Sequence, residues 1–312
     1  MHIRHFLHII FALRIVFCPS LSMGDPIVID KSSPLNEPPL APMLGGSPHP
    51  LNFSPEYAIK RLFQTMFPSL LFNNQPKSGG YSSLGSGAID LRYYVRDHTR
   101  WTSDEDLHSS VPRYHRQIHF GKWIDENKNC LDTRSEVLLR DSMDRDSVVL
   151  SKKKRCSVKA GKWNDPYTGR IFRIVKQVQV DHVVPLKNAY YSGAFRWNKA
   201  KRCHYANFLD NNYHLRTVSA HENMSKQDRG PEEYLPPNTQ FVCNYLREWM
   251  KIKAIWQLEV STQERDAIEY YLDAYKCPVS DYLMDSEELL MERSFADAWV
   301  SACSLKKNRL KF

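Results

Sequence analysis

The sequence contains no CxxC pair, and beyond residue 22 it has no apolar run of the roughly 20 residues that a bilayer span requires. The first absence argues against CxxC zinc and redox sites, and the second argues against an integral membrane protein. Intrinsic disorder is not expected either, because 42% of the 312 residues are hydrophobic and 12% are aromatic. That content suffices for at least one sizeable core, and it leaves one elaborated domain and two domains equally open.

The formal charge of the chain is +8 at pH 7. Residues 1–22 hold two Arg and no acidic residue, so a chain without them carries +6. A basic balance favours polyanionic partners, such as nucleic acid or an anionic membrane surface, but it does not indicate a fold.

The N-terminus has the order of a secretory signal peptide: a basic start, a mostly apolar stretch from Phe6 to Phe17 that Arg14 interrupts, and small residues up to Ser22. A short membrane anchor is the alternative, but about 12 apolar residues are too few to span a bilayer. We therefore expect residues 1–22 to be a signal peptide, the protein to be secreted and extracellular, and its mature form to have no membrane segment.

Cysteine usage agrees with export, because removing Cys18 with the signal peptide leaves an even number. An even number in an exported chain favours disulfide bonds, whereas reduced and buried cysteines are the alternative. The six that remain are Cys130, Cys156, Cys203, Cys243, Cys277 and Cys303.

Composition divides the rest of the chain. Residues 23–88 form a Pro/Gly/Ser-rich leader, which contains one amphipathic helix with apolar residues at helical spacing between Ile59 and Leu71. A folded domain is predicted over 89–280, followed by a helical tail over 281–312. Helices are expected at about 240–256, 262–276 and 286–303.

Local patterns place the chemically interesting residues. Asp132 is positioned to cap a helix that has Glu136 in its first turns. A β-branched stretch from Ile171 to Val180 predicts a strand that ends at Asp181-His182. A helix interrupted near residues 192–193 is expected over 189–201, and a short helix over 220–228.

Asp181, His182 and Asn223 together suit the hydrolysis of phosphodiesters. A neutral imidazole on His182 can take a proton from water at neutral pH, so we predict that it is the general base. Asp181 and Asn223 are the predicted metal ligands, because a sparse set of hard oxygens favours Mg²⁺ that keeps several waters, with Mn²⁺ as a substitute. An isolated Asp-His pair more often marks an ordinary strand end, and the Asn223 helix reverses that reading.

Several strings of the sequence, in this order, resemble the secreted HNH endonuclease family of bacteria and fungi, whose active site is the ββα-metal fold. The resemblance runs from about Trp123 to Cys277. It implies an α+β fold with a ββα-metal (HNH) catalytic core, elaborated with additional helices and disulfide-bonded. The strings are Cys130-Leu131-Asp132-Thr133-Arg134 with Glu136, Asp165-Pro166-Tyr167-Thr168-Gly169, Asp181 to Leu186, Ser192-Gly193-Ala194 with Trp197, Asn223 with Lys226 and Asp228, and Leu235 to Asn238.

The resemblance also implies the disulfide pairing. Cys130 with Cys156, and Cys243 with Cys277, fall where members of the family place cysteines. Cys203 and Cys303 remain and are expected to pair with each other.

One departure concerns His214, which stands where the family usually has the Asn that braces the loop bearing the base. A ring nitrogen of His214 can make such hydrogen bonds, so we expect it to belong to the catalytic group. The base is otherwise less well oriented, unless Asn211 or Asn212 compensates. This substitution therefore bears on rate more than on function.

Four further residues are candidates near the site. Arg134 either holds a phosphate in a bidentate manner as part of the catalytic group or forms a structural pair with Glu136. Lys226 is the predicted phosphate contact, and Glu136 and Asp228 are predicted to support the site. The basic run 152–155 either follows a polynucleotide backbone or is a solvated loop.

The sequence thus predicts a metal-dependent endonuclease that acts on DNA, with RNA as a second candidate, and that needs no small-molecule cofactor. Low sequence preference is expected, because no zinc finger or helix-turn-helix signature accompanies the motif. The alternative is a catalytically silent nucleic-acid-binding protein on the same scaffold.

Overall fold

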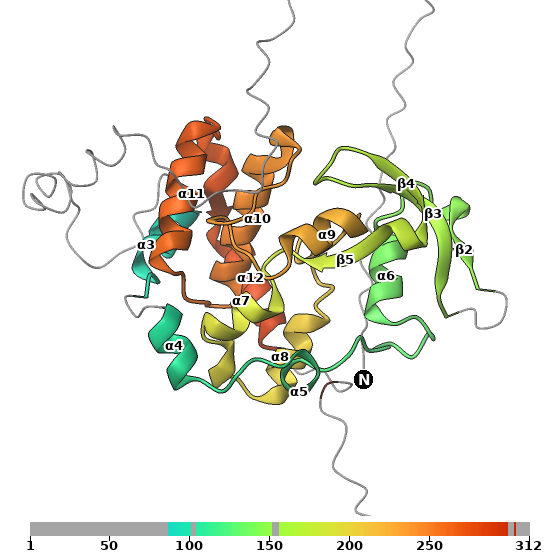
Figure 1. Cartoon of the computed structure of the whole chain (residues 1–312), viewed down its shortest axis with the longest axis horizontal. Helices are drawn as coiled ribbons and strands as arrows, with labels where there is room; N and C mark the ends of the chain where they lie inside the picture. Colours follow the sequence, from blue (N-terminus) through green and yellow to red (C-terminus); the bar gives the residue numbers. More distant parts are fainter. Residues whose placement is uncertain (1–86, 101–103, 152–155, 299–302, 304–312) are drawn as a thin grey trace, which may run out of the picture. The chain divides into compact units, whose positions relative to one another are not determined.

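Small antiparallel sheets and short helices alternate through the part of the chain that the structure, a computed structural model, describes (Figure 1). That part comprises residues 87–100, 104–151, 156–298 and 303, all within one unit that spans Ser47–Phe312. The predicted signal peptide, the amphipathic helix of the leader and the basic run 152–155 lie outside the described residues.

The strands form three sheets, in the orders β1-β7, β2-β3-β4 and β5-β6. Their bounds are β1 Ala88–Asp90, β2 Val149–Leu150, β3 Val158–Asn164, β4 Ile171–Ile174, β5 Val178–His182, β6 Leu215–Ser219 and β7 Leu283–Asp285. The α-helices are α3 Leu91–Asp97, α4 Asp104–Ser110, α5 Arg116–His119, α6 Thr133–Arg140, α7 Leu186–Tyr191, α8 Lys199–Ala206, α9 Ala220–Lys226, α10 Val242–Ile255, α11 Thr262–Ala274 and α12 Ser286–Ala296.

The order strand, strand, helix that the ββα resemblance implies occurs in β5, β6 and α9. β5 and β6 pair antiparallel, with Asp181 opposite Arg216 and His182 opposite Leu215. Ser219 ends β6 and caps α9 by accepting a hydrogen bond from the Glu222 N–H (3.0 Å). The helix then lies alongside β5 (Figure 1).

The single strand that was predicted over 171–180 is two strands. A 3₁₀ turn over Val175–Gln177 separates β4 from β5. β4 pairs with β3, whereas β5 pairs with β6, so the break allows one β-branched stretch to serve two sheets. The predicted interruption near residues 192–193 is present, because Gly193 adopts a positive φ of 115° between α7 and a short 3₁₀ helix.

Two apolar clusters hold these elements. The larger one surrounds α10 and includes the fully buried Trp249 and Trp256, together with residues of α3, α7 and α11. The smaller one joins α6 to β3, β5 and β6 through Leu138, Trp163 and Leu215. Asp132 caps α6 as predicted, accepting from the Ser135 N–H (2.9 Å). We call the larger cluster the helical core and the smaller one the sheet core.

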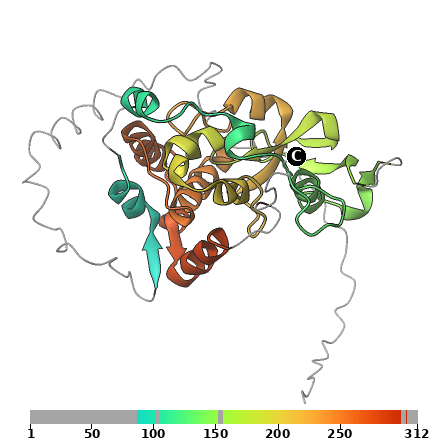
Figure 2. The ribbon, with the colours of Figure 1, turned by 90° about the horizontal axis from the view of Figure 1, so that it is seen from below.

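The described part of the predicted C-terminal tail is built into the same unit. β7 pairs with β1, which brings the first described strand beside a strand of the predicted tail (Figure 2). α12 then packs against α10, and its Arg293 donates to the Ala254 carbonyl (3.0 Å). The described part of the tail therefore contributes to the helical core.

Disulfides join the pairs that the resemblance implies: Cys130–Cys156, Cys203–Cys303 and Cys243–Cys277. Cys243 lies at the start of α10 and Cys277 follows α11, so their bond holds these two helices together. None of the described helices is long and apolar enough to cross a membrane.

Candidate active site

A cavity of about 310 Å³ opens where β5, α7 and α9 meet. Three residues that the sequence assigned to catalysis and metal binding, Asp181, His182 and Asn223, line it together. The structure therefore brings the end of a strand and the middle of a helix, 41 positions apart in sequence, to one surface. The other lining residues are Tyr114, Arg116, Val180, Pro185, Leu186, Lys187, Gln227 and Asp228.

His182 is held in one orientation and in one tautomer. Its Nε2 lies 3.0 Å from the carbonyl oxygen of Ala206, which can only accept, so Nε2 carries the proton. In the neutral ring Nδ1 is then a base, and it has no hydrogen-bond partner within the described residues. The Trp123 ring lies parallel to the imidazole, with centroids 5.2 Å apart and an interplanar angle of 3°. Burial holds the pKa of His182 well below its ordinary value, and nearby His214 and Arg116 lower it further.

His214 occupies a comparable position behind His182 but does not line the cavity. Its Nε2 donates to the carbonyl of Tyr205 (2.8 Å), the residue before Ala206. The last two carbonyls of α8 therefore each accept a hydrogen bond from one of the two imidazoles. The side chain is 1% exposed, and burial lowers the pKa of His214 to about 3. The His214 ring was predicted to brace the loop that bears the base; its Nε2 instead contacts the Tyr205 carbonyl at the end of α8, and the ring is closed to a substrate.

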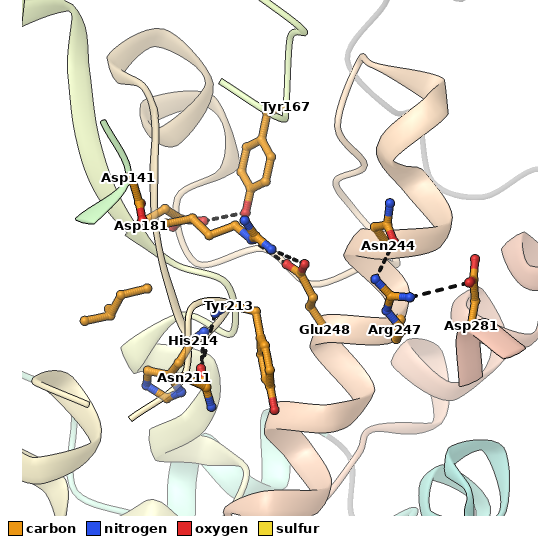
Figure 3. Close-up of polar contacts among 12 residues, drawn as sticks. Asp141, Tyr167, Asp181, Asn211, Tyr213, His214, Asn244, Arg247, Glu248 and Asp281 are labelled. Atoms are coloured by element: carbon orange, nitrogen blue, oxygen red, sulfur yellow. Dashed lines mark hydrogen bonds and ion pairs between the residues drawn. The ribbon is translucent and has the colours of Figure 1, made fainter. Parts of the chain in front are cut away.

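The loop after His182 is nevertheless braced at position 214, by the backbone. The Val183 N–H donates to the His214 carbonyl (3.2 Å). Asn211 fixes that segment in turn, because its Oδ1 accepts from the His214 N–H (2.9 Å) and the Tyr213 N–H (3.2 Å) (Figure 3). Asn211 thus takes part in the bracing that was expected of the His214 side chain.

Asp181 is buried, with 4% exposed, and each of its oxygens accepts one hydrogen bond. The Tyr167 hydroxyl donates to Oδ2 (2.7 Å) and points at the carboxylate (Figure 3). The Lys226 ammonium donates to Oδ1 (3.0 Å) and to the His182 carbonyl (2.9 Å). Burial raises the pKa of Asp181, against the opposing effects of Lys226 and Tyr167.

Lys226 has a contact other than the phosphate that was predicted for it. Its side chain is 0% exposed and does not line the cavity. Burial lowers the pKa of Lys226, and the attraction of Asp181 opposes that shift. The ammonium is therefore a fixed counter-charge behind Asp181 and is closed to a polynucleotide.

Tyr167 reaches Asp181 because a tight turn carries it. Asp165 accepts from the backbone N–H of Tyr167 (3.0 Å) and from the Thr168 hydroxyl (2.6 Å). Gly169 completes the turn at a φ of 71°, with its N–H donating to the Asp165 carbonyl (2.8 Å). The string Asp165–Gly169, which the sequence marked without a role, thus positions a hydroxyl 14 residues before the aspartate.

Asn223 is oriented by Gln179, which lies on β5. The Asn223 Nδ2 donates to Gln179 Oε1 (2.7 Å), which leaves Oδ1 without a partner within the described residues. Asn223 Oδ1 and the remaining lone pairs of Asp181 are hard-oxygen donors on one cavity wall, and they fit Mg²⁺. No group of three or more His, Cys, Asp or Glu suited to a metal occurs among the described residues, so such an ion would keep several waters.

The helical core supports this wall from behind. Arg216, opposite Asp181 on β6, forms an ion pair with Glu248 of α10 and donates to its Oε2 from Nε (2.6 Å). The Glu248 side chain is buried, whereas the Arg216 side chain is 24% exposed, so the pair is partly shielded from solvent. The ion pair joins β6 to α10.

The remaining candidates lie apart or at the rim. Arg134, half-buried on α6, does not line the cavity, and its side chain makes neither an ion pair with Glu136 nor a hydrogen bond within the described residues. Glu136 accepts from the amides of Asn127 (3.3 Å) and Asn129 (2.6 Å), so it supports the loop before Cys130. Asp228 lies at the cavity and pairs with Lys187 (2.5 Å).

Sequence reasoning did not assign Arg116, Trp123, Tyr167 or Gln179 a role in the site. Tyr167 stands in one of the strings that carry the family resemblance, and Trp123 lies at the start of the range over which the resemblance runs, so both positions carried a signal. Gln179 lies two residues before Asp181 in a strand, so alternation places the two on the same face. Nothing local to Arg116 indicates that it lines the cavity.

The GmrSD restriction endonucleases, C-terminal domain, match residues 132–269 of this chain. A protein of Arthroderma benhamiae named as an uncharacterized secreted protein is 36% identical over 154 residues, which are 49% of this chain and 72% of that protein. The chain belongs to this family of secreted, nuclease-like proteins. No solved structure matches it.

The family range contains Asp181, His182 and Asn223, together with the Tyr167 and Lys226 that hold Asp181. Arg116 and Trp123 precede it. The cavity is therefore built partly from the nuclease-like domain and partly from a preceding segment of this chain.

Proposed function

We propose that the protein is a metal-dependent endonuclease that hydrolyses phosphodiester bonds of DNA, with RNA as a second candidate substrate. The observation that carries the proposal is the hydrogen bond from His182 Nε2 to the Ala206 carbonyl. This bond leaves the basic Nδ1 available on a residue that shares a cavity with Asp181 and Asn223. Membership of a nuclease-like family supports the same reaction class.

Each residue of the site has a separate role in the proposed reaction. His182 Nδ1 accepts a proton from a water whose oxygen attacks phosphorus, and the bond from phosphorus to the departing oxygen breaks. Asp181 and Asn223 would hold the Mg²⁺, or Mn²⁺ in its place. A bound divalent ion supplies positive charge for the phosphate and for the departing oxygen. Trp123 and Ala206 keep the imidazole fixed, so it does not have to reorient during the reaction.

The proposal extends to setting and specificity. The relative named as a secreted protein and the disulfides support action outside the cell. The described cavity carries no element of a DNA-reading module, which supports low sequence preference.

A plasmid-nicking assay, with Mg²⁺ and with chelator, tests the proposal. Cleavage is expected with Mg²⁺ and not with chelator. His182→Ala is expected to lower the cleavage rate by on the order of 10²–10⁴-fold while DNA binding persists, because the imidazole acts in the transition state. Near-parental cleavage by a folded His182→Ala protein contradicts the assignment of the base, and DNA binding without cleavage by the parent protein supports the silent binding protein.

His204→Ala is the matched control. The His204 ring also lies against a backbone carbonyl, that of Phe295 (2.9 Å), and is also buried, but it does not line the cavity. Its replacement removes an equivalent hydrogen bond without removing the base, so cleavage per folded molecule should stay close to the parental value. Circular dichroism and thermal melting establish the folded fraction of both variants.

A further inference from the structure

The charged groups that line the cavity are paired, with one exception. The Lys187 ammonium lies 2.5 Å from Asp228 Oδ2, and Asp181 is held by buried Lys226. Arg116 lines the cavity, is exposed, and has no ion pair or hydrogen bond from its guanidinium within the described residues. The cavity therefore presents one uncommitted cation among its described lining residues.

The surroundings of Arg116 hold its guanidinium close to the base. The guanidinium carbon lies 5.4 Å from the centroid of the Trp123 ring, a cation–π contact. The same ring is parallel to His182 at 5.2 Å. The Trp123 ring thus contacts both the guanidinium of Arg116 and the imidazole of His182. The contact restricts the conformations of the Arg116 side chain, so binding a ligand costs less conformational entropy.

The helix that bears Arg116 is itself anchored. The last residue of α5, His119, accepts a hydrogen bond from Arg202 of α8 at its carbonyl (3.1 Å). Its ring lies 4.5 Å from that of Tyr190, and Phe120 after it is fully buried. α5 is therefore fixed to α7 and α8, which also shape the surroundings of His182.

We propose that Arg116 is the phosphate-binding group of this site, and that its guanidinium receives a phosphate oxygen of the polynucleotide backbone beside His182. A guanidinium suits this ligand because its planar donors match phosphate oxygens and its charge is permanent. The assignment replaces Lys226, which is closed to solvent, and it lies outside the range that matches the family. It rests on the proposed function for the identity of the ligand as a nucleic acid.

Arg113 offers a matched control for this residue. It is exposed, lies three positions before Arg116, and does not line the cavity. Arg113→Ala removes the same charge from the same segment, so general attraction between the segment and DNA is lost equally in both variants. Any additional effect of Arg116→Ala reports contact in the cavity.

The experiment measures binding of a short fluorescein-labelled DNA to the His182→Ala protein across a salt series, with Arg116→Ala, Arg116→Lys and Arg113→Ala added in turn. Arg116→Ala should weaken binding on the order of tenfold to hundredfold and lower the salt slope by about one. Arg116→Lys should recover only part of the DNA affinity that Arg116→Ala loses, because lysine keeps the positive charge but lacks the planar donors of the guanidinium. Equal losses for Arg116→Ala and Arg113→Ala overturn the proposal.

Calorimetry with inorganic pyrophosphate separates this inference from the proposed function. Heat of binding that disappears in Arg116→Ala and persists in Arg113→Ala supports a phosphate site, even if the protein binds no DNA and the proposed function fails. DNA binding and cleavage that survive Arg116→Ala unchanged overturn the phosphate site and leave the proposed function standing. No binding of pyrophosphate or DNA by the parent protein overturns both.

Discussion

Two buried lysines, Lys226 at the cavity and Lys253 in the helical core, use the same chemistry in different surroundings. Both are 0% exposed, and each ammonium lies 3.0 Å from a carboxylate, Asp181 in one case and Glu264 in the other. Lys253 also donates to Asn188 (2.8 Å), Ser192 (2.8 Å) and the Glu259 carbonyl (3.0 Å). Lys226 contacts in addition only the His182 carbonyl among the described residues (2.9 Å).

The difference lies in what the carboxylate faces. Glu264 is 1% exposed, caps α11 together with Ser261, and accepts from the Trp249 indole, so its partners are all protein groups. Asp181 has two protein donors and also borders a cavity. The first arrangement is complete without a ligand, whereas the second leaves lone pairs for one. An identical ion pair is thus structural in one region and part of a site in the other.

Lysine-to-methionine substitutions give the largest effect that separates the two pairs. Lys253→Met should lower the free energy of unfolding by about 3–5 kcal/mol, because Glu264 is left as an uncompensated buried charge. Lys226→Met should cost less, since water in the cavity can solvate Asp181, and Mg²⁺ should recover more stability in this variant than in the parent protein. Urea unfolding with and without Mg²⁺ measures both.

Lys251→Met is the control for these substitutions. Lys251 lies on the same helix as Lys253 and pairs with Glu288 at 2.7 Å, but the pair is partly exposed. Its loss should cost at most about 1 kcal/mol. Equal destabilisation of the two buried variants, with no response to Mg²⁺ in either, would remove the distinction between the regions.

The pH dependence of stability should differ in sign between the regions. His214, behind the cavity, has a pKa lowered from 6.5 to about 3, so unfolding takes up a proton in that window and stability falls as pH falls. Near Lys253, burial and Glu264 raise the pKa of Glu232 from 4.5 to about 8, so unfolding releases a proton there and stability falls as pH rises. Each proton corresponds to about 1.4 kcal/mol per pH unit.

Paired variants isolate the two contributions. His214→Asn, which introduces the residue usual in the family, should flatten the acid side of the stability profile. Glu232→Gln should flatten the fall in stability between about pH 4.5 and pH 8. Chemical unfolding at a series of pH values measures both, and a variant whose slope equals that of the parent protein in its own window contradicts the corresponding assignment.

Tyr167→Phe should give the smallest effect, and it tests the hydrogen bond that the Asp181 carboxylate accepts at its Oδ2. The variant removes one donor to Asp181 without changing the packing of the ring. We expect a loss of about 1 kcal/mol in unfolding free energy. The Mg²⁺ concentration for half-maximal cleavage should rise about tenfold, because groups that orient a metal ligand commonly have effects of that size.

Tyr245→Phe controls for the loss of a buried hydroxyl. Tyr245 packs edge-on against Tyr167, with ring centroids 5.7 Å apart, and its hydroxyl has no hydrogen-bond partner within the described residues. Its removal should change neither stability nor the Mg²⁺ requirement by a comparable amount. Similar shifts in both variants would show that Tyr167 acts through packing.

Much of the local structure could be predicted because its causes are close together in sequence. Asp132 caps α6 three residues from its donor, and the strand that ends at Asp181-His182 is followed after two residues by Pro185, which cannot continue a central strand. The division of 171–182 into two strands was missed, since β-branched residues favour either sheet equally. Only pairing with β3 or with β6 separates them.

The roles of Lys226 and Arg134 show where such reasoning ends. A lysine next to a catalytic motif and an arginine in a family string both suit phosphate binding by chemical type. Burial closes Lys226 to a phosphate, because α9 packs on β5. Arg134 on α6 is only half-buried, but it does not line the cavity. Arg116, with no local signal, reaches the cavity because α5 docks on α8.

By itself, the sequence determined the chemical groups of the site, their order along the chain and the strand and helix that carry them, because these follow from residue type and short-range patterning. The tertiary structure decided which groups are paired, buried or open. His182 gains its orienting carbonyl from 24 residues away, and Asp181 gains its counter-charge from 45 residues away. Hydrogen bonds and desolvation over such separations arise only when strands pair and helices pack, so no local pattern contains them.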